Sequence, residues 1–211
     1  MPFDGFLKKR IVTINSNING EIKFYSWFGK KTLYVNSVAQ SGGEYVRMWN
    51  KSIDGLKKLN IEKSLVLGVG GATVIEKIRD KYPEAIITGV ELDHQIIKIA
   101  QRFFRLKTDA KTKIVVSNAE TWIKKSKDKD QYDLIVVDLF LTKYNPEFSR
   151  KENFLKKLKI LLRENGEILY NSHFRPDSPE EFGEFEEMCR KIFSFVKVIF
   201  SYRYNRVMLF K

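Results

Sequence analysis

The chain has 211 residues and a formal net charge of +12, with 43% apolar and 30% charged residues. This length suits a single domain with a small appendage, and the composition excludes a disordered, collagen-like or low-complexity chain. One cysteine, Cys189, and two histidines, His94 and His173, exclude an internal disulfide and disfavour a zinc site, so no metal is expected. No apolar run is long enough to cross a membrane and the amino terminus lacks signal-peptide order, so we expect a cytoplasmic protein with no membrane partner.

The first forty residues predict a small antiparallel sheet. Between residues 11 and 38, short apolar and aromatic runs alternate with turn residues. Residues 40–43 interrupt this pattern, and residues 44–59 carry apolar side chains at spacings of three and four, which predicts a helix with one apolar face. We therefore expect a β-rich amino-terminal region over residues 1–43 and a second domain over residues 44–211.

From residue 64 onward the sequence alternates between strands and helices. The predicted strands cover residues 64–67, 86–90, 114–116, 134–137 and 168–170, and the predicted helices cover residues 74–78, 96–104, 119–125 and 154–162. Short continuous apolar strands fit a parallel sheet covered on both faces by helices. A turn at residues 164–166, a helix over residues 179–192 and a hairpin of residues 196–200 and 207–210 complete the pattern. The expected class is α/β, with a doubly wound, mostly parallel sheet.

A glycine loop and an acid point to a nucleoside site. Gly68, Gly70 and Gly71 permit a tight turn from strand to helix, and the helix that follows favours an anionic group at its start. The loop lacks the third glycine of a dinucleotide motif, so a turn without a ligand remains an alternative. Glu91 lies 23 positions after Gly68, a spacing at which an acid binds a ribose diol. Asp93 fits the role of a helix cap better than Glu91 does.

Three further polar residues follow predicted strands. Asn118 either contacts an adenine edge or only caps the helix that it opens. Asp138 follows four apolar residues, so it is expected at the carboxyl end of a central strand beside the point where the strand order reverses. Capping of the next segment is its alternative role. His173 follows the strand at 168–170 and either lines the pocket as a base or is incidental.

With these residues in place, the chain resembles the spermidine synthase (polyamine aminopropyltransferase) family of the class I S-adenosylmethionine-dependent methyltransferase superfamily. The segments that carry the resemblance are residues 35–40, 45–48, 65–71, 90–93, 132–138 and 161–168. It implies a seven-stranded, Rossmann-like sheet and a donor that is either S-adenosylmethionine or its decarboxylated form.

The resemblance also implies roles for single residues. Gln40 would contact the nucleoside, Glu91 would hold the ribose, and Asn118 would stand at the adenine-binding position. Asp138 would be the catalytic aspartate that orients and deprotonates an attacking amine, and Tyr45 would lie beside that amine.

Departures from the family pattern affect the predicted reaction. Gly71 replaces an aspartate that holds the amino group of the donor, Leu141 replaces a second aspartate after the catalytic one, and a substrate-contacting segment is shortened to residues 201–206. Fewer acids and a positive net charge disfavour a polycation, and Gly71 is expected to leave room for the carboxylate of the intact donor. The main prediction is methyl transfer from S-adenosylmethionine, bound between the glycine loop, Glu91 and Asn118, to an unidentified small molecule. The alternative is aminopropyl transfer to an amine.

Two further hypotheses stay open. The basic clusters at residues 57–58, 102–113, 124–129 and 150–159 lie mostly on helices between core-facing residues, so a solvated outer face is their simplest interpretation. RNA methylation is a rival enzyme function, although no RNA-binding motif is present. A non-catalytic nucleoside-binding or scaffold protein is the rival from another class. A homo-oligomer is expected from the resemblance alone.

Overall fold

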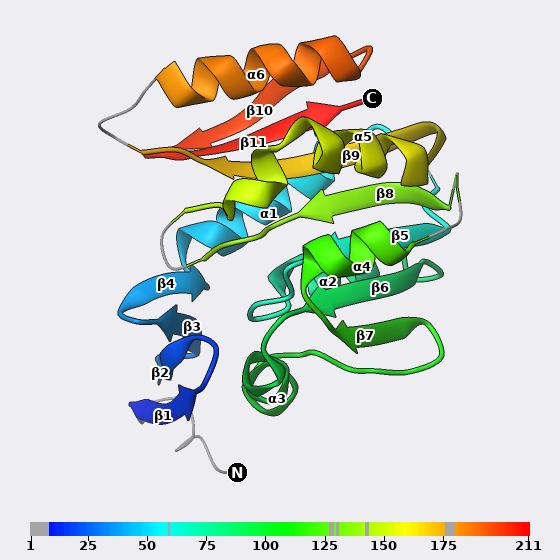
Figure 1. Cartoon of the computed structure of the whole chain (residues 1–211). Helices are drawn as coiled ribbons and strands as arrows, with labels where there is room; N and C mark the ends of the chain where they lie inside the picture. Colours follow the sequence, from blue (N-terminus) through cyan, green and yellow to red (C-terminus); the bar gives the residue numbers. More distant parts are fainter. Residues whose placement is uncertain (1–8, 59, 127–128, 130, 142–143, 176–179) are drawn as a thin grey trace.

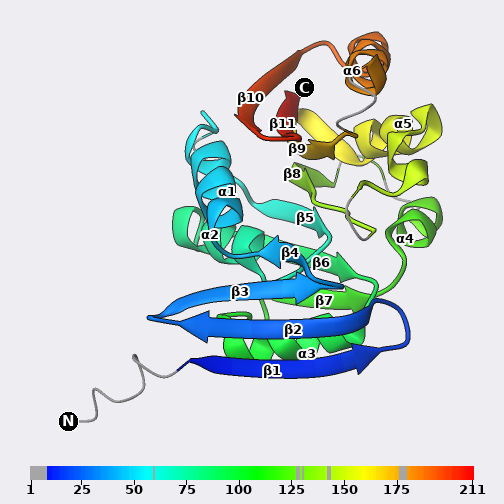
Figure 2. The same cartoon turned by 90° about the vertical axis from the view of Figure 1, so that its left-hand side faces the viewer.

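The amino-terminal strands form a four-stranded antiparallel sheet in the computed structural model, which describes residues 9–58, 60–126, 129, 131–141, 144–175 and 180–211 (Figures 1 and 2). The strands are β1 (Arg10–Ser16), β2 (Gly20–Trp27), β3 (Lys30–Val35) and β4 (Val38–Ser41). The antiparallel sheet agrees with the prediction, but the predicted interruption at residues 40–43 begins too early. Gln40 and Ser41 belong to β4, and the chain leaves the strand at the next residue, Gly42, whose φ of +97° no ordinary side chain adopts readily.

The second sheet has seven strands in the order β10-β11-β9-β8-β5-β6-β7. They are β5 (Lys63–Leu67), β6 (Ile86–Glu91), β7 (Thr112–Val116), β8 (Tyr132–Val137), β9 (Leu162–His173), β10 (Val196–Tyr202) and β11 (Asn205–Phe210). Strands β5 to β9 pair in parallel and the last two pair antiparallel, which confirms the predicted doubly wound sheet and terminal hairpin. The strand order reverses between β5 and β8, where such folds bind ligands.

Helices cover both faces of this sheet (Figure 1). They are α1 (Glu44–Asp54), α2 (Thr73–Lys81), α3 (His94–Phe103), α4 (Ala119–Lys125), α5 (Glu152–Leu161) and α6 (Glu180–Ile192), with a short 3-10 helix at Glu147–Arg150. The buried side chains of α4, α5 and α6 share one core cluster, and those of α1 and α2 share another. Two tightly packed layers therefore enclose the apolar strands, as the sequence predicts.

Two predicted elements differ clearly from the structure, and one predicted boundary is not described. Helix α1 ends at Asp54, five residues before the predicted end at residue 59, and Gly55 closes it by donating its N–H to the carbonyl of Lys51. The turn expected at residues 164–166 lies inside β9 as a bulge, because Tyr132 pairs with Leu162 while Leu134 pairs with Glu167. The predicted first residue of the last helix, residue 179, lies outside the described residues.

Helix α3 joins the two sheets. Its residues Ile96, Ile99 and Phe103 share a core with the inner face of the amino-terminal sheet, where the rings of Phe103 and Phe24 stack 4.3 Å apart. Asp93 caps α3 by accepting the N–H of Gln95, as predicted. The amino-terminal sheet completes its core with a helix of the second region, so the division at residues 43 and 44 into separate domains stays a prediction.

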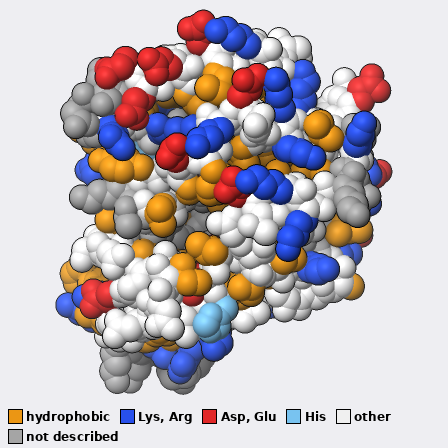
Figure 3. Space-filling model, viewed as in Figure 1, with side chains coloured by type: hydrophobic (Ala, Val, Ile, Leu, Met, Phe, Trp, Pro, Cys, Tyr) orange, Lys and Arg blue, Asp and Glu red, His pale blue; other side chains and the backbone are white. Residues whose placement is uncertain are grey.

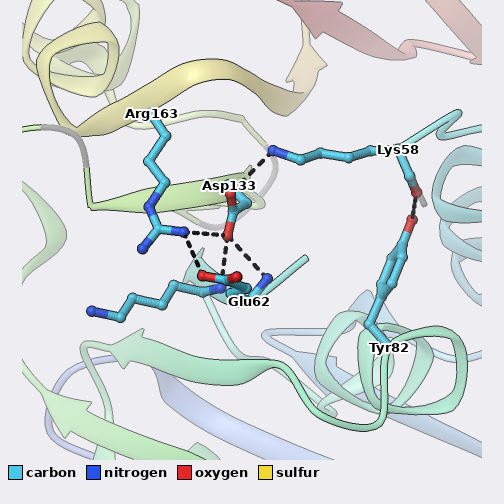
Figure 4. A network of polar contacts seen from close by, with 6 residues as sticks. Lys58, Glu62, Tyr82, Asp133 and Arg163 are labelled. Atoms are coloured by element: carbon cyan, nitrogen blue, oxygen red, sulfur yellow. Dashed lines mark hydrogen bonds and ion pairs between the residues drawn. The ribbon is translucent and has the colours of Figure 1, made fainter. Parts of the chain in front are cut away.

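The start of β8 is fixed by a network of charges (Figure 4). Asp133 accepts hydrogen bonds from the backbone N–H groups of Glu62 and Lys63, each at 3.0 Å, and pairs with Lys58 and Arg163 at 3.1 Å. Burial alone would raise the pKa of this carboxyl, but its backbone donors and the Lys58 ammonium outweigh burial and hold the pKa below its usual range. This carboxylate therefore ties β8 to β5 and β9 at the amino ends of the strands.

Cations and acids are interleaved on the face of the molecule in Figure 3. Helix-surface pairs include Lys124 with Glu120 at 2.6 Å and Lys156 with Glu152 at 2.6 Å, both spaced four residues apart. Such exposed pairs contribute little to stability but keep the surface solvated. They fit the interpretation of the helix-borne clusters as an outer face. No helix within the described part of the chain is long and apolar enough to span a membrane.

Candidate active site

A cavity of about 360 Å³ lies at the carboxyl ends of the central strands, between the switch point and the end of β4. It is lined by all eight site residues predicted from the sequence: Gln40, Tyr45, Gly68, Gly70, Gly71, Glu91, Asn118 and Asp138. The volume is typical of a pocket for a nucleoside-sized ligand. His173 is not among the residues that line it.

Gly68 brings the glycine loop against the end of β8. Its φ is +90°, and a Cβ at this position would lie 2.2 Å from the backbone oxygen of Asp138. The neighbouring strands already converge here, since the N–H of Asp138 donates to the carbonyl of Leu67 at 2.8 Å. Only glycine permits both the conformation and the approach. The loop and Asp138 therefore form one wall of the cavity.

Gly71 lies close against the end of β4, where a side chain would have no room. A Cβ at Gly71 would lie 2.5 Å from Oγ of Ser41 and 3.0 Å from Cε1 of Phe104. The Ser41 hydroxyl also forms a hydrogen bond with the Thr73 hydroxyl at 2.8 Å. The end of β4 therefore packs into the space that a side chain at Gly71 would need, and the room for a donor carboxylate beside Gly71 stays a prediction.

Glu91 is buried and holds the glycine loop. Its Oε2 accepts the N–H groups of Val69 at 3.0 Å and Gly70 at 3.2 Å, and its Oε1 accepts the N–H of Asp93 at 3.1 Å. Burial raises the pKa of this carboxyl, while the backbone donors oppose the rise. Glu91 thus shapes the loop and lines the cavity, and its contact with a ribose stays a prediction.

Asn118 performs the capping role and also lines the cavity. Its Oδ1 accepts the N–H of Thr121 at 3.1 Å at the start of α4. This bond uses only the carbonyl side of the amide, so the two alternatives for Asn118 are compatible. Its contact with an adenine ring stays a prediction.

Asp138 is a buried carboxylate with two neutral donors. Its Oδ2 accepts Nε1–H of Trp49 at 2.9 Å, and its Oδ1 accepts Nδ2–H of Asn171 at 2.9 Å. Burial raises the pKa of Asp138 to about 6, opposed by both donors and assisted by the charge of Glu91. The group is therefore mostly ionised at pH 7 and still able to exchange a proton near that pH.

A second amide fixes the orientation of Asn171. Nδ2 of Asn205 on β11 donates to Oδ1 of Asn171 at 3.0 Å, so the amino group of Asn171 must face Asp138. Asn171 is fully buried and Asn205 is 5% exposed, which keeps water from competing with these bonds. The chain of amides presents Asp138 with a donor and favours its ionised form.

Tyr45 lies one helical turn before Trp49 on α1. Burial raises the pKa of its phenol, and the negative charge of Asp138 adds to the rise. Tyr45 is therefore a protonated hydroxyl donor at the cavity wall throughout the neutral pH range.

Three residues around Asp138 escaped the sequence analysis. Trp49 belongs to the apolar face of a predicted helix, and Asn171 and Asn205 are polar residues next to apolar runs in β9 and β11. A buried amide in an apolar strand is a usable signal, since such a group needs a partner. His173, whose role as a base was left open beside an incidental one, does not line the cavity, and its ring lies 5.7 Å from that of Phe140 and 5.6 Å from that of Tyr144.

The charges of the described cavity lining are all negative: Glu91, Asp138 and Glu147, with no lysine, arginine or histidine among the described lining residues. Nor does the described part of the chain gather three or more His, Cys, Asp or Glu side chains that could hold a metal ion. A ligand with positive charge therefore matches this lining.

The family model of the spermine/spermidine synthase domain matches residues 50–204. The chain belongs to this family. A polyamine aminopropyltransferase of Vibrio vulnificus is 33% identical over 112 residues, which cover 53% of this chain and 38% of that protein. An eEF1A lysine and N-terminal methyltransferase homolog of Drosophila melanogaster is 29% identical over 84 residues, which cover 39% of this chain and 12% of that protein. The chain thus spans less than half the length of these curated relatives.

Solved structures share the fold. A spermidine synthase in complex with the transition-state analogue AdoDATO superposes with a TM-score of 0.74 at 17% identity, covering 97% of this chain and 74% of that one. Human methyltransferase-like protein 13 in complex with SAH superposes with a TM-score of 0.65 at 18% identity, covering 79% of this chain and 78% of that one. The seven-stranded sheet with a four-stranded amino-terminal sheet is therefore the spermidine synthase fold.

Proposed function

We propose that this chain transfers an aminopropyl group from decarboxylated S-adenosylmethionine to an amine. Aminopropyl transfer was the alternative prediction from the sequence, and we now prefer it to methyl transfer. The observation that carries it is that every charged residue of the described cavity lining is an acid. The decarboxylated donor carries an ammonium and a sulfonium and no anion, whereas the carboxylate of the intact donor would face Glu91 and Asp138 in a site of low dielectric.

Family membership supports the same choice, because the Vibrio relative is a polyamine aminopropyltransferase. In this proposal the adenosine part of the donor lies between the glycine loop, Glu91 and Asn118.

Asp138 performs the proton chemistry in this proposal. Its carboxylate accepts a hydrogen bond from the ammonium form of the acceptor and takes one proton, which leaves a neutral amine with a free nitrogen lone pair. That lone pair attacks the aminopropyl carbon bonded to sulfur. The new C–N bond forms as the C–S bond breaks, and the bonding pair moves to sulfur to give neutral methylthioadenosine. Tyr45 and Trp49 line the cavity wall, and Trp49 fixes the direction of this carboxylate through its N–H.

The test is calorimetric titration of the purified chain with the decarboxylated and the intact donor at equal salt. We expect the decarboxylated donor to bind at least tenfold more tightly, a difference of about 1.4 kcal/mol. Incubation with a mixture of primary amines should then release methylthioadenosine. Tighter binding of the intact donor, with no methylthioadenosine formed, would refute the proposal.

Methyl transfer remains the second candidate because Gly71 lacks the acid of the family pattern and because the Drosophila relative is a methyltransferase homolog. The same incubation distinguishes it, since methyl transfer from the intact donor yields S-adenosylhomocysteine. Formation of that product with a bound amine would make methyl transfer the function of this cavity.

A further inference from the structure

The outer face of the amino-terminal sheet carries exposed aromatic rings. Phe24 of β2 and Leu33 of β3 share the core with α3, so they define the inner face of this sheet. Successive side chains of a strand point to opposite faces, which places Tyr25 and Trp27 on the outer face, turned toward the viewer in Figure 2. Trp27 is 50% exposed and Tyr25 is partly exposed. The two side chains leave the strand about 7 Å apart, two residues along β2.

Phe28 extends this row of rings at the turn between β2 and β3. Trp27 pairs with Lys30, so only residues 28 and 29 form the loop, and both have positive φ angles, +48° at Phe28 and +72° at Gly29. Asparagine, aspartate or glycine usually fills the first position of such a turn. Phe28 is nevertheless 56% exposed, with its ring 5.0 Å from that of Trp27. Neither the turn nor the core therefore explains a phenylalanine here.

Two cations lie beside these rings. Nζ of Lys9 lies 5.7 Å from the centre of the Tyr25 ring, and Lys30 stands directly opposite Trp27 in the register of the hairpin. Both lysines are exposed, and neither forms an ion pair with a residue that the structure describes. Ile11, opposite Tyr25 on β1, is 52% exposed. We call this set the outer patch: Lys9, Ile11, Tyr25, Trp27, Phe28 and Lys30.

The charge of the outer patch selects an anionic partner. Farther along the same face Lys23 is neutralised by Glu21 at 2.7 Å, so the excess of positive charge is confined to the rings. A second copy of the chain docked face to face would bring Lys9 and Lys30 against like charges. Alternating rings and cations instead match a single-stranded nucleic acid, whose bases stack on aromatic faces while its phosphates meet lysines.

We infer that the outer patch binds a single-stranded nucleic acid, with bases stacked on Tyr25, Trp27 and Phe28 and phosphates at the two lysines. This interaction goes beyond the proposed transfer reaction and does not use its cavity. Val35 and Ser41 line the cavity from the inner side of the sheet, whereas the patch lies on the outer side. The bound strand is therefore a partner of the protein and not the substrate of Asp138.

The first experiment compares a single strand with a duplex. A labelled, mixed-sequence RNA of about twelve nucleotides is titrated with the purified chain, and binding is followed by fluorescence anisotropy at 50–200 mM salt. We expect the single strand to bind about tenfold more tightly than its duplex, since a duplex offers phosphates but no free base faces. The slope of log K against log salt should be about −1.4, because each of two phosphate contacts contributes about −0.7. Equal binding of both RNAs, or binding of neither, would overturn the inference.

The second experiment removes single rings. Phe28→Gly suits the backbone angle of the turn, so the variant should fold, and Trp27→Ala changes an exposed side chain. Each should weaken binding of the single strand about tenfold and leave the duplex within twofold. Phe195→Ala is the matched control, because Phe195 is 42% exposed and has Nζ of Lys211 at 5.9 Å from its ring. Equal weakening in the control would contradict a site at the outer patch.

The third experiment removes the cations. Lys9→Gln combined with Lys30→Gln should bring the salt slope for the single strand from about −1.4 to near zero. Lys124→Gln combined with Lys156→Gln removes the same charge from the surfaces of α4 and α5 and should leave the slope unchanged. Equal changes in the two double variants would show that net charge, and not the outer patch, attracts the RNA.

Other occupants of the patch give distinct results. Sedimentation of a dimer that becomes a monomer in Phe28→Gly, without RNA binding, would assign the face to a second copy and overturn the inference. Binding to vesicles of anionic phospholipid that requires Phe28, again without RNA binding, would assign it to a membrane surface and overturn it as well. Formation of methylthioadenosine should stay within twofold in Phe28→Gly. The RNA titration is informative even if no amine is turned over, so failure of the proposed function leaves this test intact.

Discussion

Strand β8 has an aspartate at each end, and the two carboxylates have opposite surroundings. Asp133 at the start accepts two backbone N–H groups and pairs with Lys58 and Arg163, so its pKa lies below the usual range. Asp138 at the end accepts hydrogen bonds from two neutral donors and pairs with no cation of the described residues, and burial raises its pKa to about 6.

This difference shows how to distinguish a carboxylate that stabilises the fold from one that is suited to proton transfer. A carboxylate paired with cations and backbone donors stabilises the fold and has no reason to accept a proton at neutral pH. A carboxylate buried with neutral donors at a cavity wall costs stability, and such groups are typical of active sites. The same strand therefore carries an anchor at one end and, in the proposed function, the proton acceptor at the other.

The largest expected effect is on catalysis. Asp138→Asn removes the proton acceptor while keeping the shape of the side chain, so kcat with decarboxylated S-adenosylmethionine and an accepted amine should fall about 10³-fold. Asp133→Asn is the matched control at the other end of β8, and its kcat should stay within twofold. An Asp138→Asn enzyme with undiminished kcat would remove this residue from the mechanism and favour a role as a scaffold.

The next effect is on stability. Asp133→Asn leaves Lys58 and Arg163 without their buried anion, so the free energy of unfolding should fall by about 2–3 kcal/mol. Urea unfolding at pH 7 measures this loss. Arg190→Gln, which breaks an exposed pair with Glu186 on α6, serves as control and should cost less than about 0.5 kcal/mol. Equal losses in both variants would mean that Asp133 anchors nothing.

The amide chain predicts a change in the pH profile. Asn171→Leu removes one donor that lowers the pKa of Asp138, so that pKa should rise above about 6. Since the ionised form is the active one, the acid limb of kcat/KM should move to higher pH by about one unit. Trp49→Phe removes the other donor and should move the limb in the same direction. A limb that stays in place in both variants would show that these donors do not tune Asp138.

The sequence predicts the site residues that follow apolar strands. It does not predict the residues whose role depends on which strands pair with each other. Gly68, Glu91 and Asp138 each follow an apolar run, and parallel strands bring their carboxyl ends to one edge, so the sequence places all three together. Asn171 and Asn205 become visible only when β11 is known to pair with β9.

Gly71 shows the converse. A glycine in the sequence suggests open space, but Ser41 of β4 occupies the space that a side chain at Gly71 would need. Strand β4 reaches this point because it continues to Ser41. The chain then turns at Gly42, two residues before α1 begins at Glu44. Local patterns contain no information on which distant side chain occupies a gap.

The smallest expected effect is a difference in how the aspartates at the two ends of β8 change the free energy of unfolding with pH. An acid whose pKa is higher in the folded chain binds its proton more tightly there, so Asp138 lowers stability as pH rises from about 4 to about 6, the interval between its usual and its folded pKa.

Asp138→Asn is uncharged at every pH, so it should raise the free energy of unfolding by about 1 kcal/mol at pH 8, with part of the gain lost because its amino group faces a donor. At pH 4 the wild-type carboxyl is already protonated in the folded chain, and this gain should vanish. Asp133→Asn should behave differently, with a loss that stays nearly constant from pH 8 to pH 4, because a carboxyl whose pKa is lowered below its usual value stays ionised over this range and its contribution declines only at lower pH. Urea unfolding of the wild type and both variants at pH 4, 6 and 8 measures the two trends, and a gain for Asp138→Asn that is the same at pH 4 and pH 8 would mean that burial of this charge is not what the fold pays for.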